Sequence, residues 1–244
     1  MNIPEVDSLA VDLVAAIRGG DVERLLQLLG ENPGVANARI VDAGGTSRTL
    51  LHVVTDWPGH FPNGAGTVAA LVAAAADVNA AVIHNTPNHS PETPLHWAAS
   101  SDDVAVLDAL LDGGADIEAP GAIFTGGTPM SDAVVFAQWQ AARRLLERGA
   151  QTTIWQAAAL GLLNRVKAFC VDSPQSSEEM TNAFWNACRG GQQETAEYLL
   201  DRGATVNWIG HDRKTPLDVA EESGVGVLVG WLRSRGANRT EELS

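Results

Sequence analysis

Lysine is nearly absent from this 244-residue chain: Lys167 and Lys214 are the only two, so the positive side chains are almost all arginines. The formal net charge is −14, and the isoelectric point is about 4.7. A surface of this charge repels phosphate, which argues against nucleic acid and against an anionic membrane as a partner. It does not argue against a basic protein partner.

Cysteines and long apolar runs are scarce as well. The two cysteines, Cys170 and Cys188, form no spaced framework, and the sequence shows no secretory leader, so we expect reduced thiols in a cytosolic protein. The longest run of small apolar residues, from Val68 to Ala76, is far too short to cross a bilayer. Apolar residues still make up 45% of the chain, which is enough for a continuous core.

The signatures of common catalytic sites are also missing. The sequence has no glycine-rich phosphate loop, no G-x-S-x-G elbow, no paired cysteines and no His-x-x-x-His. The glycines of GVGVLVG at 224–230 are interpreted as part of an ordinary turn between helices, because no strand–helix–strand context follows them. The sequence therefore predicts a protein that is not an enzyme and that carries no cofactor and no metal.

What the chain does contain is an internal repeat. The stretch TPLHWAAS at 93 returns as TPMSDAVV at 128 and TPLDVAEE at 215, and weaker copies begin at 49, 152 and 182. Thr93 can cap a helix, Pro94 suits the first helical turn, and the Gly-Ala pairs that close several copies permit a left-handed helix end. One repeat is therefore predicted to be a short helix, a second antiparallel helix, and a turn or hairpin that leads onward.

The segment TPLHWAASSDDVAVLDALLDGGADIEA at 93–119 resembles an ankyrin repeat, and the segment 8–37 resembles the N-terminal unit of that family. The resemblance implies an all-α ankyrin-repeat solenoid of bacterial type, with about seven helix–turn–helix units in one domain that spans residues 1–244. Its hairpin loops are expected to be short, with some enlarged and some missing. Beside the capping unit at 8–37, the repeats start near 49, 93, 128, 152, 182 and 215.

The spacing of the copies departs from the usual period of about 33 residues. The first gap, from 49 to 93, is long enough for two inserted loops, at 56–63 and 82–92. The gap from 128 to 152 is short, so the hairpin near 149–153 is expected to be missing.

Five of the six histidines lie between positions 52 and 96. The resemblance implies that His52 and His96, in the Thr-x-x-His place of the motif, bond to the backbone at a hairpin base and tie adjacent repeats. In the copies at 152 and 182, where a full hairpin is lacking, Trp155 and Trp185 are predicted to take that place. We expect their large rings to fill the vacated space.

The inserted loops support an alternative hypothesis, in which they form the site of a metal-binding or small-ligand-binding enzyme. The candidate residues are Asp56, His60, His84 and His89. The two loops leave opposite ends of the helices, however, and a ten-residue helix spans about 15 Å. Zinc sites also show tighter ligand spacing. Solvated or hydrogen-bonded loop histidines are the other interpretation of these residues.

The resemblance further implies a concave face built from hairpin tips and first helices. On each first helix, the residue after the motif histidine is expected to face outward, together with residues three and four positions later. Aromatic residues in neighbouring repeats would form anchors for a partner, although Trp97 could equally pad the contact between repeats. We therefore predict a cytoplasmic protein-interaction module that binds a protein partner, basic in our expectation, through this groove. The predicted contacts are Trp57, Trp97, Asp132, Phe136, Gln156, Asn186 and Arg189.

Overall fold

The computed structural model describes residues 1–85, 90–173 and 175–243. Contacts between residues divide the chain into two compact units, Met1–Gln151 and Thr152–Ser244, which are described separately below. Their boundary falls between two helices, at the join where the sequence leaves no room for a hairpin. The described residues are mostly helical, which confirms the predicted repeat of helix pairs.

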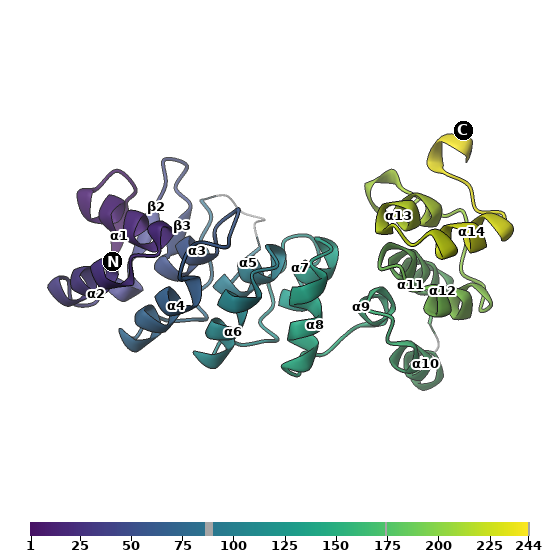
Figure 1. The fold of residues 1–244 in the computed structure, drawn as a ribbon, viewed down its shortest axis with the longest axis horizontal. Coiled ribbons are helices and arrows are strands. Elements are labelled where there is room, and N and C mark those ends of the chain that lie inside the picture. Colours follow the sequence, from purple (N-terminus) through teal and green to yellow (C-terminus); the bar gives the residue numbers. More distant parts are fainter. Residues whose placement is uncertain (86–89, 174, 244) are drawn as a thin grey trace. The chain divides into compact units, whose positions relative to one another are not determined.

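The first unit consists of four antiparallel helix pairs (Figure 1). First helices pack on first helices, as α3 and α7 do on α5, and second helices pack on second helices, as α2 and α6 do on α4. This stacking buries one leucine-rich or alanine-rich stripe of every helix. The helices are α1 (Ser8–Gly19), α2 (Val22–Glu31), α3 (Leu50–Thr55), α4 (Gly64–Ala73), α5 (Pro94–Ser100), α6 (Val104–Asp112), α7 (Pro129–Val135) and α8 (Trp139–Glu147).

A small sheet that the sequence analysis did not predict lies at the start of the first unit. Strand β1 (Asn2–Pro4) runs parallel to β2 (Arg39–Val41), and β2 pairs antiparallel with β3 (Ser47–Thr49). Each of the first two strands buries one isoleucine, and Ile83 of the next loop forms a bridge to Ser47. The strands are only three residues long, too short to show the alternation that identifies a strand in a sequence.

The second unit contains three helix pairs (Figure 1). The long first helix α11 packs against both α9 and α13. A side chain at Gly190 would overlap the carbonyl group of Ala159, so the glycine permits the close approach of α11 to α9. The helices are α9 (Ile154–Ala159), α10 (Leu163–Asp172), α11 (Ser177–Arg189), α12 (Gln193–Leu200), α13 (Pro216–Ser223) and α14 (Gly226–Ser234).

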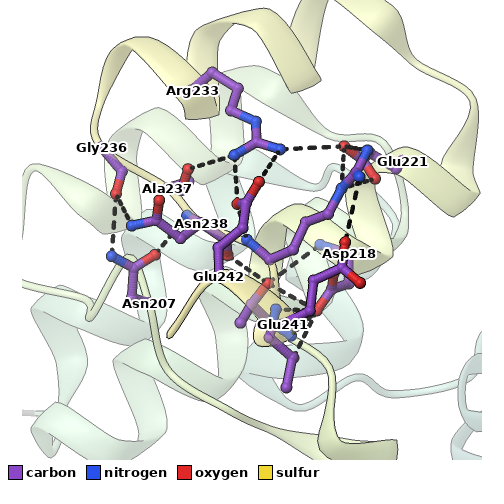
Figure 2. Close-up of polar contacts among 12 residues, drawn as sticks. Asn207, Asp218, Glu221, Arg233, Gly236, Ala237, Asn238, Glu241 and Glu242 are labelled. Carbon is purple, nitrogen blue, oxygen red and sulfur yellow. Dashed lines mark hydrogen bonds and ion pairs between the residues drawn. The ribbon is translucent and has the colours of Figure 1, made fainter. Parts of the chain in front are cut away.

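The chain end closes the last repeat with a polar network, shown in Figure 2. The Thr240 hydroxyl donates to the Asp218 carboxylate at 2.7 Å, and the Arg239 guanidinium pairs with Glu221 at 2.9 Å. The Thr215 hydroxyl, at the start of α13, donates to the Asn238 carbonyl at 2.8 Å. Residues 238–240 are therefore held against the start of α13 by hydrogen bonds.

Candidate interaction site

The two motif histidines tie each repeat to the next one. The Nδ1 atom of His52 accepts the backbone N–H of Thr49 at 3.3 Å, and its Nε2 atom lies 3.1 Å from the Glu92 carbonyl oxygen. Because Nδ1 accepts, the proton sits on Nε2, which donates to that carbonyl. His96 repeats the arrangement with Thr93 at 3.1 Å. Its Nε2 lies 3.4 Å from the carbonyl oxygen of Gly127.

Both rings are buried in this role. Burial lowers the pKa of His52 to about 3 and the pKa of His96 to about 4, so both rings are neutral at physiological pH. The carbonyl groups that they bind belong to the residues directly before the next capping threonines, Thr93 and Thr128. The predicted scaffold role of the two histidines is thereby confirmed.

Trp185 makes the same connection in the second unit. Its Nε1–H donates to the carbonyl of Lys214 at 2.9 Å, and Lys214 stands directly before the capping Thr215. The prediction that this ring fills a space left by a missing hairpin is wrong. The loop that precedes α13 is present, and the indole N–H reaches its base as the imidazole N–H of His52 reaches Glu92.

The motif of α9 begins one residue later than predicted. The helix cap is Thr153, whose N–H donates to the Gln156 side-chain oxygen at 2.7 Å, so Gln156 and not Trp155 takes the histidine place. A shift of one residue turns a helical side chain by about 100°. Gln156, expected to face outward, is accordingly only 3% exposed.

Two other predicted contacts of the second unit also lie differently from the expectation. Asn186 is only 4% exposed, because α11 is enclosed between α9 and α13. Its side-chain amide donates to the Asn182 carbonyl at 2.9 Å. Arg189 is half-buried, with its guanidinium 5.9 Å from the centre of the Trp185 ring. Burial lowers the pKa of Arg189.

In the first unit, Trp57 does not continue a helical row. Helix α3 ends at Thr55, so Trp57 lies in the loop at 56–63, where 85% of it is exposed. Val53, which was expected to face outward on α3, is fully buried. The prediction for Trp57 assumed that α3 continues to this residue, but the helix ends at Thr55.

Phe136 lies in a cluster of exposed apolar side chains. Its ring is 5.8 Å from the ring of Phe124, and the two residues are 41% and 71% exposed. Ile123, beside Phe124 in the loop before α7, is 45% exposed. Phe124 was not among the contacts predicted from the sequence. The stretch AIFTGG at 122–127 does place two large apolar residues, Ile123 and Phe124, beside a pair of glycines, and exposed apolar residues of this kind can mark an interaction site.

Two carboxyl groups are buried beside this cluster. Asp132 is 1% exposed and Glu92 is 7% exposed. Asp132, which was predicted to face outward, is covered because the backbone of Ile123 and the side chain of Glu92 lie against its carboxyl. Among the described residues, neither carboxyl oxygen of Asp132 has a hydrogen-bond partner of good geometry.

Burial raises the pKa values of both carboxyl groups. Burial, reinforced by the charge of Glu92, raises the pKa of Asp132 to about 8, and burial also raises the pKa of Glu92. At neutral pH Asp132 therefore retains its proton. The sequence contains no lysine or arginine from residue 49 to residue 142, and Arg144 and Arg148 of α8 pair with Asp108.

Trp97 joins the acids to the core. Its side chain donates to the Glu92 carboxylate, and its ring meets the His52 ring edge to face at 4.8 Å. Trp97 is half-buried, so it both pads the contact between repeats and reaches the surface. We name the whole set the acid–aromatic patch, which consists of Glu92, Trp97, Ile123, Phe124, Asp132 and Phe136.

The candidate residues of the inserted loops have structural partners. Asp56 accepts ion pairs from Arg18 at 2.6 Å and from Arg48 at 2.9 Å. The backbone N–H of His60 donates to Asp103, and its Nε2 lies 2.9 Å from the Ser101 carbonyl oxygen, which ties the loop to the next repeat. His84 is half-buried, and His89 lies outside the described residues. Over the described ranges, no group of three or more side chains is arranged to hold a metal ion.

Charge is unevenly divided between the two units. Residues 1–151 hold 18 acidic and 7 basic residues, a formal charge of −11, and residues 152–244 hold 12 acidic and 9 basic residues, a charge of −3. The acid–aromatic patch thus lies in the unit with the larger negative charge. In the part of the chain that the structure describes, no helix combines the length and the apolar character needed to span a membrane.

Comparison with known proteins points to one family. Residues 92–122, which begin at Glu92 of the patch, match the family model of the ankyrin repeat. The fold is similar to that in the crystal structure of the human ASB11 ankyrin repeat domain, with a TM-score of 0.50 at 22% identity, over 90% of this chain and 96% of that chain. No curated protein matches the sequence. At this identity, the structural similarity concerns the fold alone.

Proposed function

Because this chain is an ankyrin-repeat protein, we propose that it is a non-catalytic interaction module that binds a protein partner through the acid–aromatic patch, on the groove side of its first unit. Ankyrin repeats are generally protein–protein interaction modules. The observation that carries the proposal is the exposed pair of rings, Phe124 and Phe136, with Ile123 beside them. Exposed aromatic residues bordered by polar groups are typical of the energetic centre of an interface.

The charge of the first unit supports a basic partner. A formal charge of −11 on residues 1–151 attracts a positively charged protein and speeds its approach. Trp97 and Phe136 are the two predicted contacts that lie in the patch at its surface, and the exposed Trp57 is a further contact residue outside it. We place the protein in the cytoplasm, where the free thiols Cys170 and Cys188 remain reduced.

The test is capture of a partner from the native lysate, followed by affinity measurement with the purified partner and single variants. Phe124→Ala and Phe136→Ala are each expected to weaken binding by about 1–3 kcal/mol, because each removes part of the apolar anchor. Arg143→Ala, at an exposed position of α8, is the control and is expected to leave the affinity unchanged. Folded Phe124 and Phe136 variants that keep the wild-type affinity would show that the patch is not the binding site.

A further inference from the structure

The acid–aromatic patch also indicates what kind of segment it receives. Resting on the proposed function, we propose that the patch binds a partner segment in which an arginine or lysine stands next to a large apolar residue. The basic group enters between Glu92 and Asp132, and the apolar side chain packs on Phe124 and Phe136. The partner chemistry is thus a cationic–apolar sequence and not an acidic or purely apolar one.

The first reason is that the buried acids have no cation. Some acidic residues of this unit have a cation beside them, as Asp108 does, which accepts from Arg144 and Arg148, each at 2.8 Å. Neither carboxyl oxygen of Asp132 has a hydrogen-bond partner of good geometry within the described part of the chain, although only 1% of the residue is exposed. A buried carboxyl pair without a counter-ion destabilises the fold, whereas a basic group from a partner would restore the missing interactions.

The second reason is the placement of the acids relative to the exposed rings. Asp132 and Phe136 are four residues apart, the Phe136 N–H bonds to the Asp132 carbonyl, and both side chains therefore lie on one side of α7. The Ile123 backbone lies against the Asp132 carboxyl, and the Phe124 ring next to it packs on Phe136. The acid pair therefore lies directly beside the exposed apolar cluster.

The loop segment next to the Asp132 carboxyl carries side chains that the solvent already reaches. Ile123 and Phe124, in the loop between α6 and α7, are 45% and 71% exposed. Because the Ile123 backbone itself lies against the Asp132 carboxyl, the basic group reaches Asp132 only if this loop moves. A guanidinium group suits the position, because its flat faces stack on aromatic rings while its edge donates to carboxylates.

The test uses two synthetic peptides, acetyl-Phe-Arg-Leu-amide and the same peptide with citrulline in place of arginine. Citrulline keeps the shape of the side chain and removes its charge. Each peptide is titrated into the ¹⁵N-labelled full chain, and binding is followed at the indole N–H of Trp97 and the backbone N–H groups of Ile123 and Phe124. The arginine peptide is expected to bind at least about tenfold more tightly, because only it forms charge-assisted bonds with the acids.

Variants identify the origin of this preference. In Glu92→Gln and Asp132→Asn, the ratio of the two affinities is expected to fall to near one, and melting curves verify that both variants are folded. Phe124→Ala is expected to weaken both peptides alike and to leave their ratio unchanged. The proposal is overturned if neither peptide binds, if both bind equally to the wild type, or if the preference survives both acid substitutions.

This result is separable from the proposed function. A captured protein partner that is lost with Phe136→Ala but retained with Glu92→Gln and Asp132→Asn would leave the interaction module intact and disprove the basic segment. A captured partner that is indifferent to Phe124→Ala and Phe136→Ala would disprove the patch as the binding site of the module.

Discussion

In the first unit, His52 and His96 stand three residues after the caps of α3 and α5, and in the second unit Gln156 and Asp218 stand three residues after the caps of α9 and α13, whereas Trp185 lies inside α11. The two imidazoles and the indole all donate a ring N–H to the carbonyl group directly before the next capping residue. In the last repeat, Asp218 instead accepts from Thr240 of the tail. The comparison shows that the bond between repeats matters more than the residue type that makes it.

The two units also differ in what surrounds this bond. In the first unit, long loops before α5 and α7 cover polar groups such as Glu92 and Asp132 and expose apolar ones such as Phe124. In the second unit, the connection from α10 to α11 is short, and α11 packs closely between α9 and α13. The proposed binding surface therefore lies where the loops are long, and the closely enclosed helix α11 lies where they are short.

The largest expected effect concerns the indole of the second unit. Trp185→Ala is expected to destabilise the protein by about 3–5 kcal/mol, because the ring is buried and its loss leaves a cavity as well as an unpaired Lys214 carbonyl. Trp185→Phe keeps most of the ring and is expected to cost only about 1–2 kcal/mol. Urea denaturation followed by circular dichroism measures both values. Equal costs for the two variants would show that the hydrogen bond, and not the packing of the ring, dominates.

The next effect concerns the buried acid of the first unit. Because its pKa is raised from 3.8 to about 8 on folding, the contribution of Asp132 to stability is full below pH 4 and is lost as the pH rises toward 8. Asp132→Asn does not ionise, so it is expected to exceed the wild type in stability by about 1–3 kcal/mol at pH 8. The difference should shrink as the pH falls toward 5.

The measurement is urea denaturation of both proteins at several pH values between about 5 and 9. Protonation of His52 and His96 lowers stability below pH 6.5, but it does so in both proteins and cancels in the difference. A difference that is constant with pH would mean that Asp132 is not the group that titrates.

The smallest expected effect tests whether the glutamine found at this position in the second unit can replace the histidine of the first unit. His96→Ala is expected to cost about 1–3 kcal/mol, because the N–H of Thr93 and the carbonyl of Gly127 lose their partner. His96→Gln, which copies Gln156, can still accept the Thr93 N–H and is expected to cost less than about 1 kcal/mol. Denaturation curves compare the variants with Arg143→Ala, an exposed control on α8. A glutamine that costs as much as alanine would show that the imidazole cannot be replaced in the first unit.

Most of the fold could be predicted from the sequence, because its signals are local. A capping threonine, a proline in the first turn and an apolar stripe each act within one helix, so helix pairs such as α5 and α6 follow from the residues themselves. The frame of α9 was misassigned because Thr152 and Thr153 can both cap a helix, and the structure uses the second. Trp57 was misplaced because the row of outward positions was continued past Thr55, although the predicted loop at 56–63 with its Pro58 already indicates a helix end there.

The candidate site could be predicted only in part. Phe136 was identified by helical spacing and is exposed, whereas Asp132 and Asn186, chosen by the same spacing, are buried. A helix position specifies the direction of a side chain but not what lies in that direction. The loop before α7 covers Asp132, and the neighbouring helices enclose Asn186.

The sequence by itself determined the repeat and the helix caps, because each of these depends on residues a few positions apart. The histidine ties, which span 40 and 31 residues, were implied by the family resemblance. Only the tertiary structure decided that Phe124 meets Phe136 and that Glu92 meets Asp132. These residues come from different repeats, and their contact depends on how a loop between repeats folds over a neighbouring helix. That path is set by packing between distant segments, which no short-range pattern of residues encodes.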